Sequence, residues 1–159
     1  MRFLEWLSGL CSAKDNRRPP LTEREVLDFE SAYGIRLPED YRNYLLTVAG
    51  TTPGFAPGYG LHNCLGHRPK PGDFLQSPFP HMQDWNEMDN DSYEDDVQVA
   101  GSLLLAHLGC THYVRLVVTG PMRGTVWGDS RGGSEGLVML ENAAGNPMTF
   151  EEWIHQNGG

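Results

Sequence analysis

Apolar side chains recur at intervals of three or four residues just after position 21, and this spacing predicts an amphipathic helix. Thr22 precedes the pattern and Glu25 follows three residues later, which is the spacing of a capping box. Gly34 comes directly after the pattern, and glycine readily adopts the left-handed conformation that ends many helices. The apolar face of this predicted helix consists of Val26, Phe29 and Tyr33.

A second helix is predicted a few residues further on. Pro38 suits the first turn of a helix, where its missing N–H has no intrahelical partner to lose. Glu39 and Asp40 then lie where the helix dipole favours negative charge. We expect Gly50 to end this helix as Gly34 ends the first. Its apolar face is predicted to consist of Tyr41, Tyr44, Leu45 and Val48.

The pattern changes between residues 51 and 83, where prolines and glycines leave no sustained period. This stretch is either a long ordered loop or a variable insertion. Directly after it, Trp85 and Met88 are spaced to share one face of a short helix.

The C-terminal third favours strands, because its apolar runs are short and rich in β-branched and aromatic residues. Successive strands with short turns predict an antiparallel meander. Residues 128–135, GDSRGGSE, are interpreted as a polar hairpin connection, since they lack the lysine and the following helix of a phosphate-binding loop. The predicted strands are 102–107, 112–119, 124–127 and 136–140.

A last helix is predicted from Thr149, because Glu152 completes a second capping box. The order of elements predicts an α+β fold in which N-terminal helices pack on an antiparallel sheet and a C-terminal helix closes the chain. Residues 1–20 are predicted to form a short helix and a linker, and residues 21–159 a single domain. The residues expected to dock the last helix on the sheet are Phe150, Trp153 and Ile154.

The formal net charge of −9 argues against binding to nucleic acid or to an anionic membrane surface, and favours a basic protein partner. No apolar run approaches the ~20 residues of a membrane-spanning helix. The odd and sparse cysteines do not indicate a disulfide framework, so a reducing, cytoplasmic location is expected. We expect a monomer or a weak dimer.

Seven of the acidic residues fall between positions 84 and 96, together with two aromatic residues. An EF-hand loop counted from Asp89 would need glycine where Glu94 stands, so calcium binding is not favoured. Paired carboxylates for hydrolysis, a solvated acidic surface and a docking surface for a basic partner remain as interpretations. The candidate partner-binding residues are Asp84, Trp85, Glu87, Asp89, Asp91, Tyr93, Glu94, Asp95 and Asp96.

Other candidate sites are weaker. A zinc site would need about four nitrogen or sulfur ligands in a tetrahedron, and the paired C-x-x-C spacing typical of such sites is missing. A thiol nucleophile would pair Cys64 or Cys110 with His107 or His112, but no local signature surrounds either cysteine. We therefore expect no catalytic residue, no metal and no cofactor. The possible metal ligands are His62, Cys64, His67, Cys110 and His112.

The helix pair resembles the opening motif of the SUKH superfamily, which includes the Smi/Knr-type regulators. The matching positions of that motif are Phe29, Glu30, Gly34, Leu37, Pro38, Asp40, Tyr41, Leu45 and Gly50. Residues 79–86 and 149–154 are similar to later segments of the family. In the strand region the resemblance rests on Gly101, Gly109, Leu116, Val117, Gly124, Val126 and Trp127.

The resemblance covers roughly residues 22–156 and implies helices packed against an antiparallel sheet. It also implies a binding protein without catalytic residues, because many bacterial members are immunity proteins that neutralise a nuclease or deaminase toxin domain. A regulatory interaction scaffold without a toxin partner is the alternative, and a hydrolase is a distant third.

Overall fold

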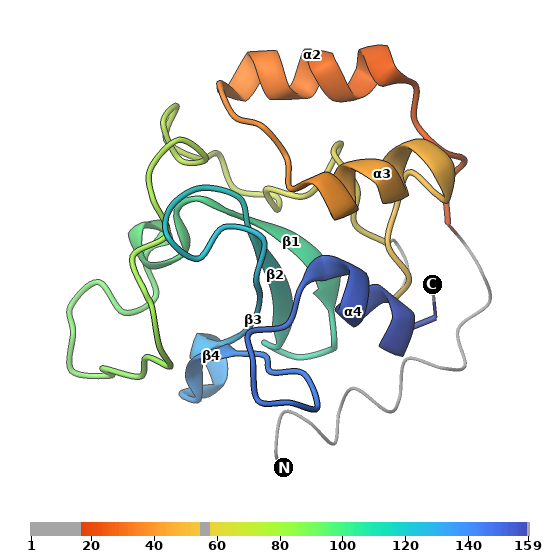
Figure 1. Ribbon diagram of the computed structural model, residues 1–159. Coiled ribbons are helices and arrows are strands. Elements are labelled where there is room, and N and C mark those ends of the chain that lie inside the picture. The colour runs from red at the N-terminus through yellow and green to blue at the C-terminus, as the bar shows by residue number, and fades with distance from the viewer. Residues whose placement is uncertain (1–16, 55–57, 159) are drawn as a thin grey trace.

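The computed structural model describes residues 17–54 and 58–158, and it confirms the predicted α+β arrangement (Figure 1). The helix predicted near the N-terminus lies outside the described residues. Two helices are followed by a long connection, an antiparallel sheet and a closing helix. The elements are α2 (Glu23–Tyr33), α3 (Glu39–Thr47), the 3₁₀ helix η2 (Asp96–Val99), β1 (Ser102–His107), β2 (Tyr113–Val117), β3 (Val126–Ser130), the 3₁₀ helix η3 (Arg131–Gly133), β4 (Gly136–Met139) and α4 (Phe150–Gln156).

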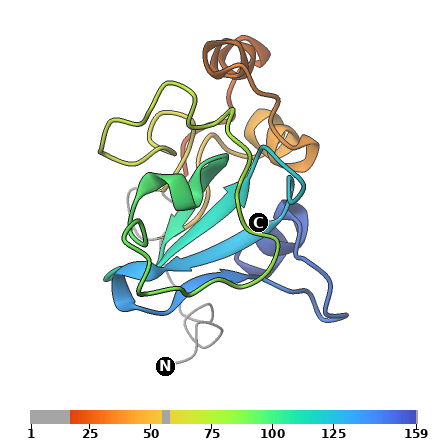
Figure 2. The same ribbon diagram turned by 90° about the vertical axis from the view of Figure 1, so that its left-hand side faces the viewer.

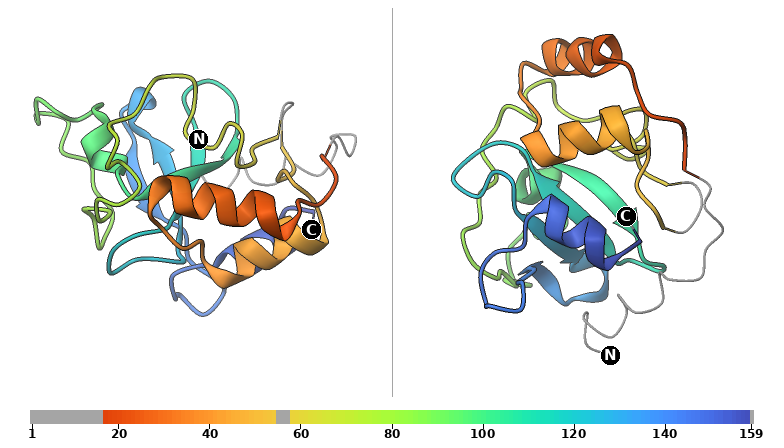
Figure 3. Two further views of the ribbon diagram at one scale, coloured as in Figure 1. Left: turned by 90° about the horizontal axis from the view of Figure 1, so that it is seen from above. Right: turned by 45° about the vertical axis from the view of Figure 1, so that its right-hand side comes forward.

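Helix α2 has both of the predicted end signals. The Thr22 hydroxyl accepts a hydrogen bond from the Glu25 backbone N–H, and the Glu25 carboxylate accepts one from the Thr22 N–H at 2.7 Å. Gly34 ends the helix with φ 61°, a left-handed conformation that glycine adopts without strain. Helix α2 lies on α3 and is the helix farthest from the sheet (Figures 1 and 3).

Helix α3 lies between α2 and the sheet and also contacts α4. The rings of Tyr41 and Tyr44 pack on Phe150 with centroids 4.9 and 5.3 Å apart. The prediction that α3 continues to Gly50 is wrong, because the helix ends at Thr47. The Gly50 N–H donates to the carbonyl oxygens of residues 18 and 19 instead of to its own helix. Val48 is 49% exposed, so the prediction that it belongs to the apolar face of this helix is wrong.

The four strands form an antiparallel meander in the order β1-β2-β3-β4, as predicted. A β-bulge at Leu105 interrupts the pairing of β1 with β2. The prediction that residues 128–135 form only a connection is wrong, since Asp129 pairs with Leu137 and Ser130 with Gly136. Strand β3 therefore continues to Ser130 and places Asp129 inside the sheet, 4% exposed.

The two faces of the sheet are covered differently. Helices α3 and α4 cover one face, and the connection between α3 and β1 runs over the other (Figure 2). Phe79 of this connection packs on Trp127 of β3, with ring centroids 4.9 Å apart. Arg115 of β2 pairs with Trp127 across the strands, so their side chains share the face beneath the connection. Within the described residues, none of the helices has the length and apolarity to span a membrane.

Candidate functional site

The acidic segment, residues 84–96, begins against the edge strand β4. Trp85 and Leu137 exchange two backbone hydrogen bonds with N···O distances of 2.9 and 2.8 Å. The Asp84 carboxylate accepts a further hydrogen bond from the Met139 N–H at 2.9 Å. This pairing holds the backbone extended at Trp85, so the prediction of a short helix with Trp85 and Met88 on one face is wrong. Met88 is 58% exposed.

Three aromatic rings, two of them from the acidic segment itself, stack on one another. Trp85 lies between His81 and Tyr93, with ring centroids 4.6 and 5.2 Å apart. The Tyr93 hydroxyl donates to the side-chain oxygen of Asn86 at 2.5 Å, which closes the turn between them. Tyr93 is only 8% exposed, whereas Trp85 is half-buried and keeps part of its ring at the surface.

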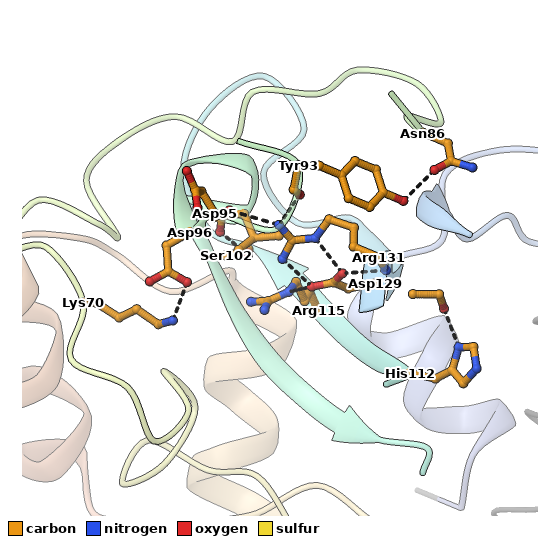
Figure 4. A network of polar contacts seen from close by, with 12 residues as sticks. Lys70, Asn86, Tyr93, Asp95, Asp96, Ser102, His112, Arg115, Asp129 and Arg131 are labelled. Carbon is orange, nitrogen blue, oxygen red and sulfur yellow. Dashed lines mark hydrogen bonds and ion pairs between the residues drawn. The ribbon is translucent and has the colours of Figure 1, made fainter. Parts of the chain in front are cut away.

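Arg131 holds the C-terminal part of the acidic segment. It follows β3 directly in η3, and its Nη1 donates to the carbonyl oxygens of Tyr93 and Asp95 at 3.1 and 3.0 Å. These two bonds connect the segment to a residue 38 and 36 positions later in the chain. Figure 4 shows this attachment of the C-terminal end. Together with the bond between Asp84 and Met139, it fixes the segment at both ends.

Arg131 is itself held by a buried ion-pair network. Its Nε donates to Asp129 Oδ1 at 2.8 Å and its Nη2 to Oδ2 at 3.0 Å, while Arg115 Nε donates to Oδ2 at 2.7 Å. Burial alone would raise the pKa of Asp129, but the Arg131 hydrogen bonds and the charges of both arginines lower it to about 2. Asp129 is thus a carboxylate at neutral pH and positions both guanidinium groups.

The carboxylates of the acidic segment point mainly outward. Asp96 is half-buried and pairs with Lys70 at 2.6 Å. Within residues 17–54 and 58–158, the other six carboxylates form no ion pair, and all six residues are exposed. They are Asp84, Glu87, Asp89, Asp91, Glu94 and Asp95. Because the backbone beneath them is fixed, these charges are displayed in a defined arrangement rather than on a free chain.

Three exposed apolar side chains lie in or beside the acidic segment, and none of them was among the predicted partner-binding residues. Met82, Met88 and Val97 are 64%, 58% and 58% exposed. The spacing of Met88 from Trp85 predicted a helix face and not a binding surface, so only the exposure of the three side chains in the fold distinguishes them. Apolar side chains surrounded by charges are typical of protein-binding surfaces, and methionine adapts well to a partner.

A comparison with protein families matches residues 20–150 to the model of the SMI1 / KNR4 family (SUKH-1). The chain belongs to this family. The comparisons with curated proteins and with solved structures give no match. Family membership confirms the resemblance drawn from the helix pair and supports a Smi/Knr-like or immunity-type protein that acts through protein–protein contacts.

In this SUKH-1 protein, the helix-pair motif has a structural role. The buried Glu30 carboxylate accepts a hydrogen bond from the Leu37 N–H at 2.9 Å and thereby fixes the turn between α2 and α3. Asp40 accepts one from the Glu151 N–H at 3.1 Å and connects α3 to the first turn of α4. These residues determine how the helices pack, so the acidic segment is a better candidate for recognition.

Within the described part of the chain, the histidines and cysteines predicted as possible ligands or nucleophiles do not form a metal site. Among the described residues, no three His, Cys, Asp or Glu side chains come close enough to hold a metal ion. Cys64 is 1% exposed, and burial raises the pKa of its thiol to about 12, so it is a poor nucleophile at neutral pH. His107 Nε2 contacts the Cys110 carbonyl oxygen at 2.9 Å, and His112 Nδ1 contacts the Ser130 hydroxyl at 2.6 Å.

Proposed function

We propose that this SUKH-1 protein is a non-catalytic immunity protein that binds a basic toxin domain through the acidic segment. The observation that supports this best is the set of six exposed carboxylates on a backbone fixed at both ends to the sheet. A partner that binds nucleic acid, such as a nuclease or deaminase domain, presents a positively charged cleft. The acidic segment complements such a cleft in charge.

The segment also offers contacts that charge alone would not provide. Met82, Met88 and the half-buried Trp85 supply apolar surface among the carboxylates. In protein interfaces, a few apolar and aromatic side chains contribute most of the affinity, while surrounding charges mainly accelerate encounter. We therefore expect the acids to determine the association rate, and Met88 and Trp85 to determine the dissociation rate.

The first experiment is co-purification with the product of the gene adjacent to the one that encodes this chain. Association of the two proteins is then measured by stopped-flow at several salt concentrations. The charge-reversed variant D89K/D91K/E94K should associate at least ~10-fold more slowly at low salt, with a weaker dependence on salt. Met88→Ala should leave the association rate unchanged and accelerate dissociation.

A second triple variant, D28K/E141K/E151K, serves as the matched control. It changes the net charge by the same amount, but its three exposed positions lie outside the acidic segment. If both triple variants associate equally slowly, total charge and not the acidic segment governs encounter, and the proposed docking face is wrong. A stable complex between this chain and a partner that has no toxic activity would favour the regulatory alternative.

A further inference from the structure

A cleft of about 370 Å³ opens on the face of the sheet that the long connection covers, beside the acidic segment. Arg115 and Tyr113 of β2 line it on the sheet side, and residues 65–68 line it on the side of the connection. Glu94 and Asp96 of the acidic segment reach its edge. The cleft is large enough for a small molecule or for one side chain of a bound protein.

Arg115 provides this cleft with hydrogen-bond donors that can bind an anion. Its Nε is engaged by Asp129 at 2.7 Å, and the terminal nitrogens point away from that carboxylate (Figure 4). Within the described residues, these two nitrogens have no hydrogen-bond acceptor from the protein, although the side chain is only 11% exposed. A guanidinium group presents its terminal N–H donors in a planar fork that matches two oxygens of one oxyanion.

The charges around the cleft leave one positive charge without a partner. Arg115 and Arg131 share the single carboxylate of Asp129, while Lys70 is paired with Asp96. The two remaining charged residues of the lining, both exposed, have opposite signs; they are Arg68 and Glu94. Two buried guanidinium groups that share one carboxylate carry one uncompensated positive charge, and an anion of one unit charge would balance it. A phosphate dianion would exceed this positive charge by one unit.

We propose that this cleft binds one carboxylate group, held by the terminal nitrogens of Arg115. The carboxylate comes either from a small organic acid or from an Asp or Glu side chain of a bound protein. The second source would place one negatively charged residue of the partner beside the acidic segment and so fix the orientation of the complex. The carboxylate site itself does not depend on the proposed immunity function, because it is tested on the free chain.

The test uses the isotope-labelled full chain and follows its arginine Nε–H signals by NMR. Sodium acetate is titrated against sodium chloride at constant ionic strength. We expect a saturable shift of the Arg115 signal with acetate and none with chloride. A blocked peptide with one aspartate between glycines, amidated at its C-terminus, then distinguishes the sources: binding of both probes indicates a protein side chain, and binding of acetate alone indicates a small acid.

Variants separate the site from a general effect of charge. Arg115→Gln should weaken acetate binding ~10-fold or more, as expected when a charged hydrogen-bond fork is lost. Arg24→Gln removes the same charge from an exposed position of α2 and should leave acetate binding unchanged. Because Arg115→Gln also removes a bond to Asp129, the titration of the unmodified chain decides the outcome if that variant does not fold. No acetate response beyond chloride, or tighter binding of inorganic phosphate than of acetate, would overturn the proposal.

Discussion

Replacing Arg131 with methionine is expected to destabilise the fold and to release the acidic segment from the sheet. The substitution keeps an unbranched side chain but removes the bonds to Asp129 and to the carbonyl oxygens of Tyr93 and Asp95. Uncompensated loss of one partner from a buried ion pair costs about 3–5 kcal/mol. Asp129 keeps Arg115, so we expect the free energy of unfolding to fall by about 2–3 kcal/mol.

The lowered pKa of Asp129 gives a second value for the free energy that this network contributes to folding. The pKa of Asp129 falls from 3.8 to about 2 in the folded state, and one pKa unit corresponds to ~1.36 kcal/mol. The network thus contributes ~2 kcal/mol at pH values above the unfolded pKa, and this is lost as the pH falls through the folded pKa. Without Arg131 the pKa of Asp129 should rise, because burial still opposes its charge. The variant should therefore unfold at a higher pH than the unmodified chain, and the stability difference between the two should shrink as the pH falls from the unfolded to the folded pKa of Asp129.

Three measurements check this reasoning. Urea unfolding at neutral pH gives the change in free energy, acid titration of the fold gives the shift in pH, and hydrogen exchange reports the backbone of residues 84–96. Arg24→Met is the control, since its ion pair with Asp28 is exposed and should contribute less than ~1 kcal/mol. Arg131→Met could change the free energy of unfolding, and the hydrogen exchange of residues 84–96, no more than Arg24→Met does. In that case the buried network does not hold the acidic segment.

Further expected outcomes concern other parts of the fold. Gly136 has φ 77°, and a Cβ there would lie 2.2 Å from a backbone oxygen of the acidic segment, so Gly136→Ala should lower the free energy of unfolding by more than ~1 kcal/mol. Gly145→Ala has a similar φ of 79° but open space, so the difference between the two variants in urea unfolding isolates the steric contact. Thr149→Ala removes the N-cap of α4 and should cost about 1 kcal/mol, measured as a lower melting temperature. Iodoacetamide followed by mass spectrometry should modify the exposed Cys110 in the native protein, and the buried Cys64 only after denaturation.

The helices and strands could largely be predicted from the sequence because their signals are local. The capping boxes at Thr22 and Thr149 place donor and acceptor three residues apart, so the two helix starts were correct. The end of α3 was not, because Gly50 is bound by a segment about 30 positions earlier in the chain, residues 18 and 19. Local patterns cannot register such a contact.

The candidate site was harder to predict, because it depends on strand register. Arg115, Asp129 and Arg131 come together only when β3 continues through Ser130, and the glycines of that stretch favoured a plain connection. The sequence did contain one signal, which is that Trp127, Asp129 and Arg131 are spaced two residues apart. In an extended strand, side chains at this spacing point to the same face. Such a strand would place Trp127 and Asp129 on one face and direct Arg131 toward the same side. The acidic composition of residues 84–96 was visible from the start, but its attachment to β4 and η3 was not.

The attachment of the acidic segment to later elements has a consequence for the order of events during synthesis. Asp84 reaches its partner Met139 across 55 positions, and Tyr93 reaches Arg131 across 38. A ribosome that adds ~5–20 residues per second would need several seconds to deliver those partners after the segment itself has emerged. A nascent chain therefore cannot display the finished surface until β4 has been made, and fragments that end before that strand should lack it.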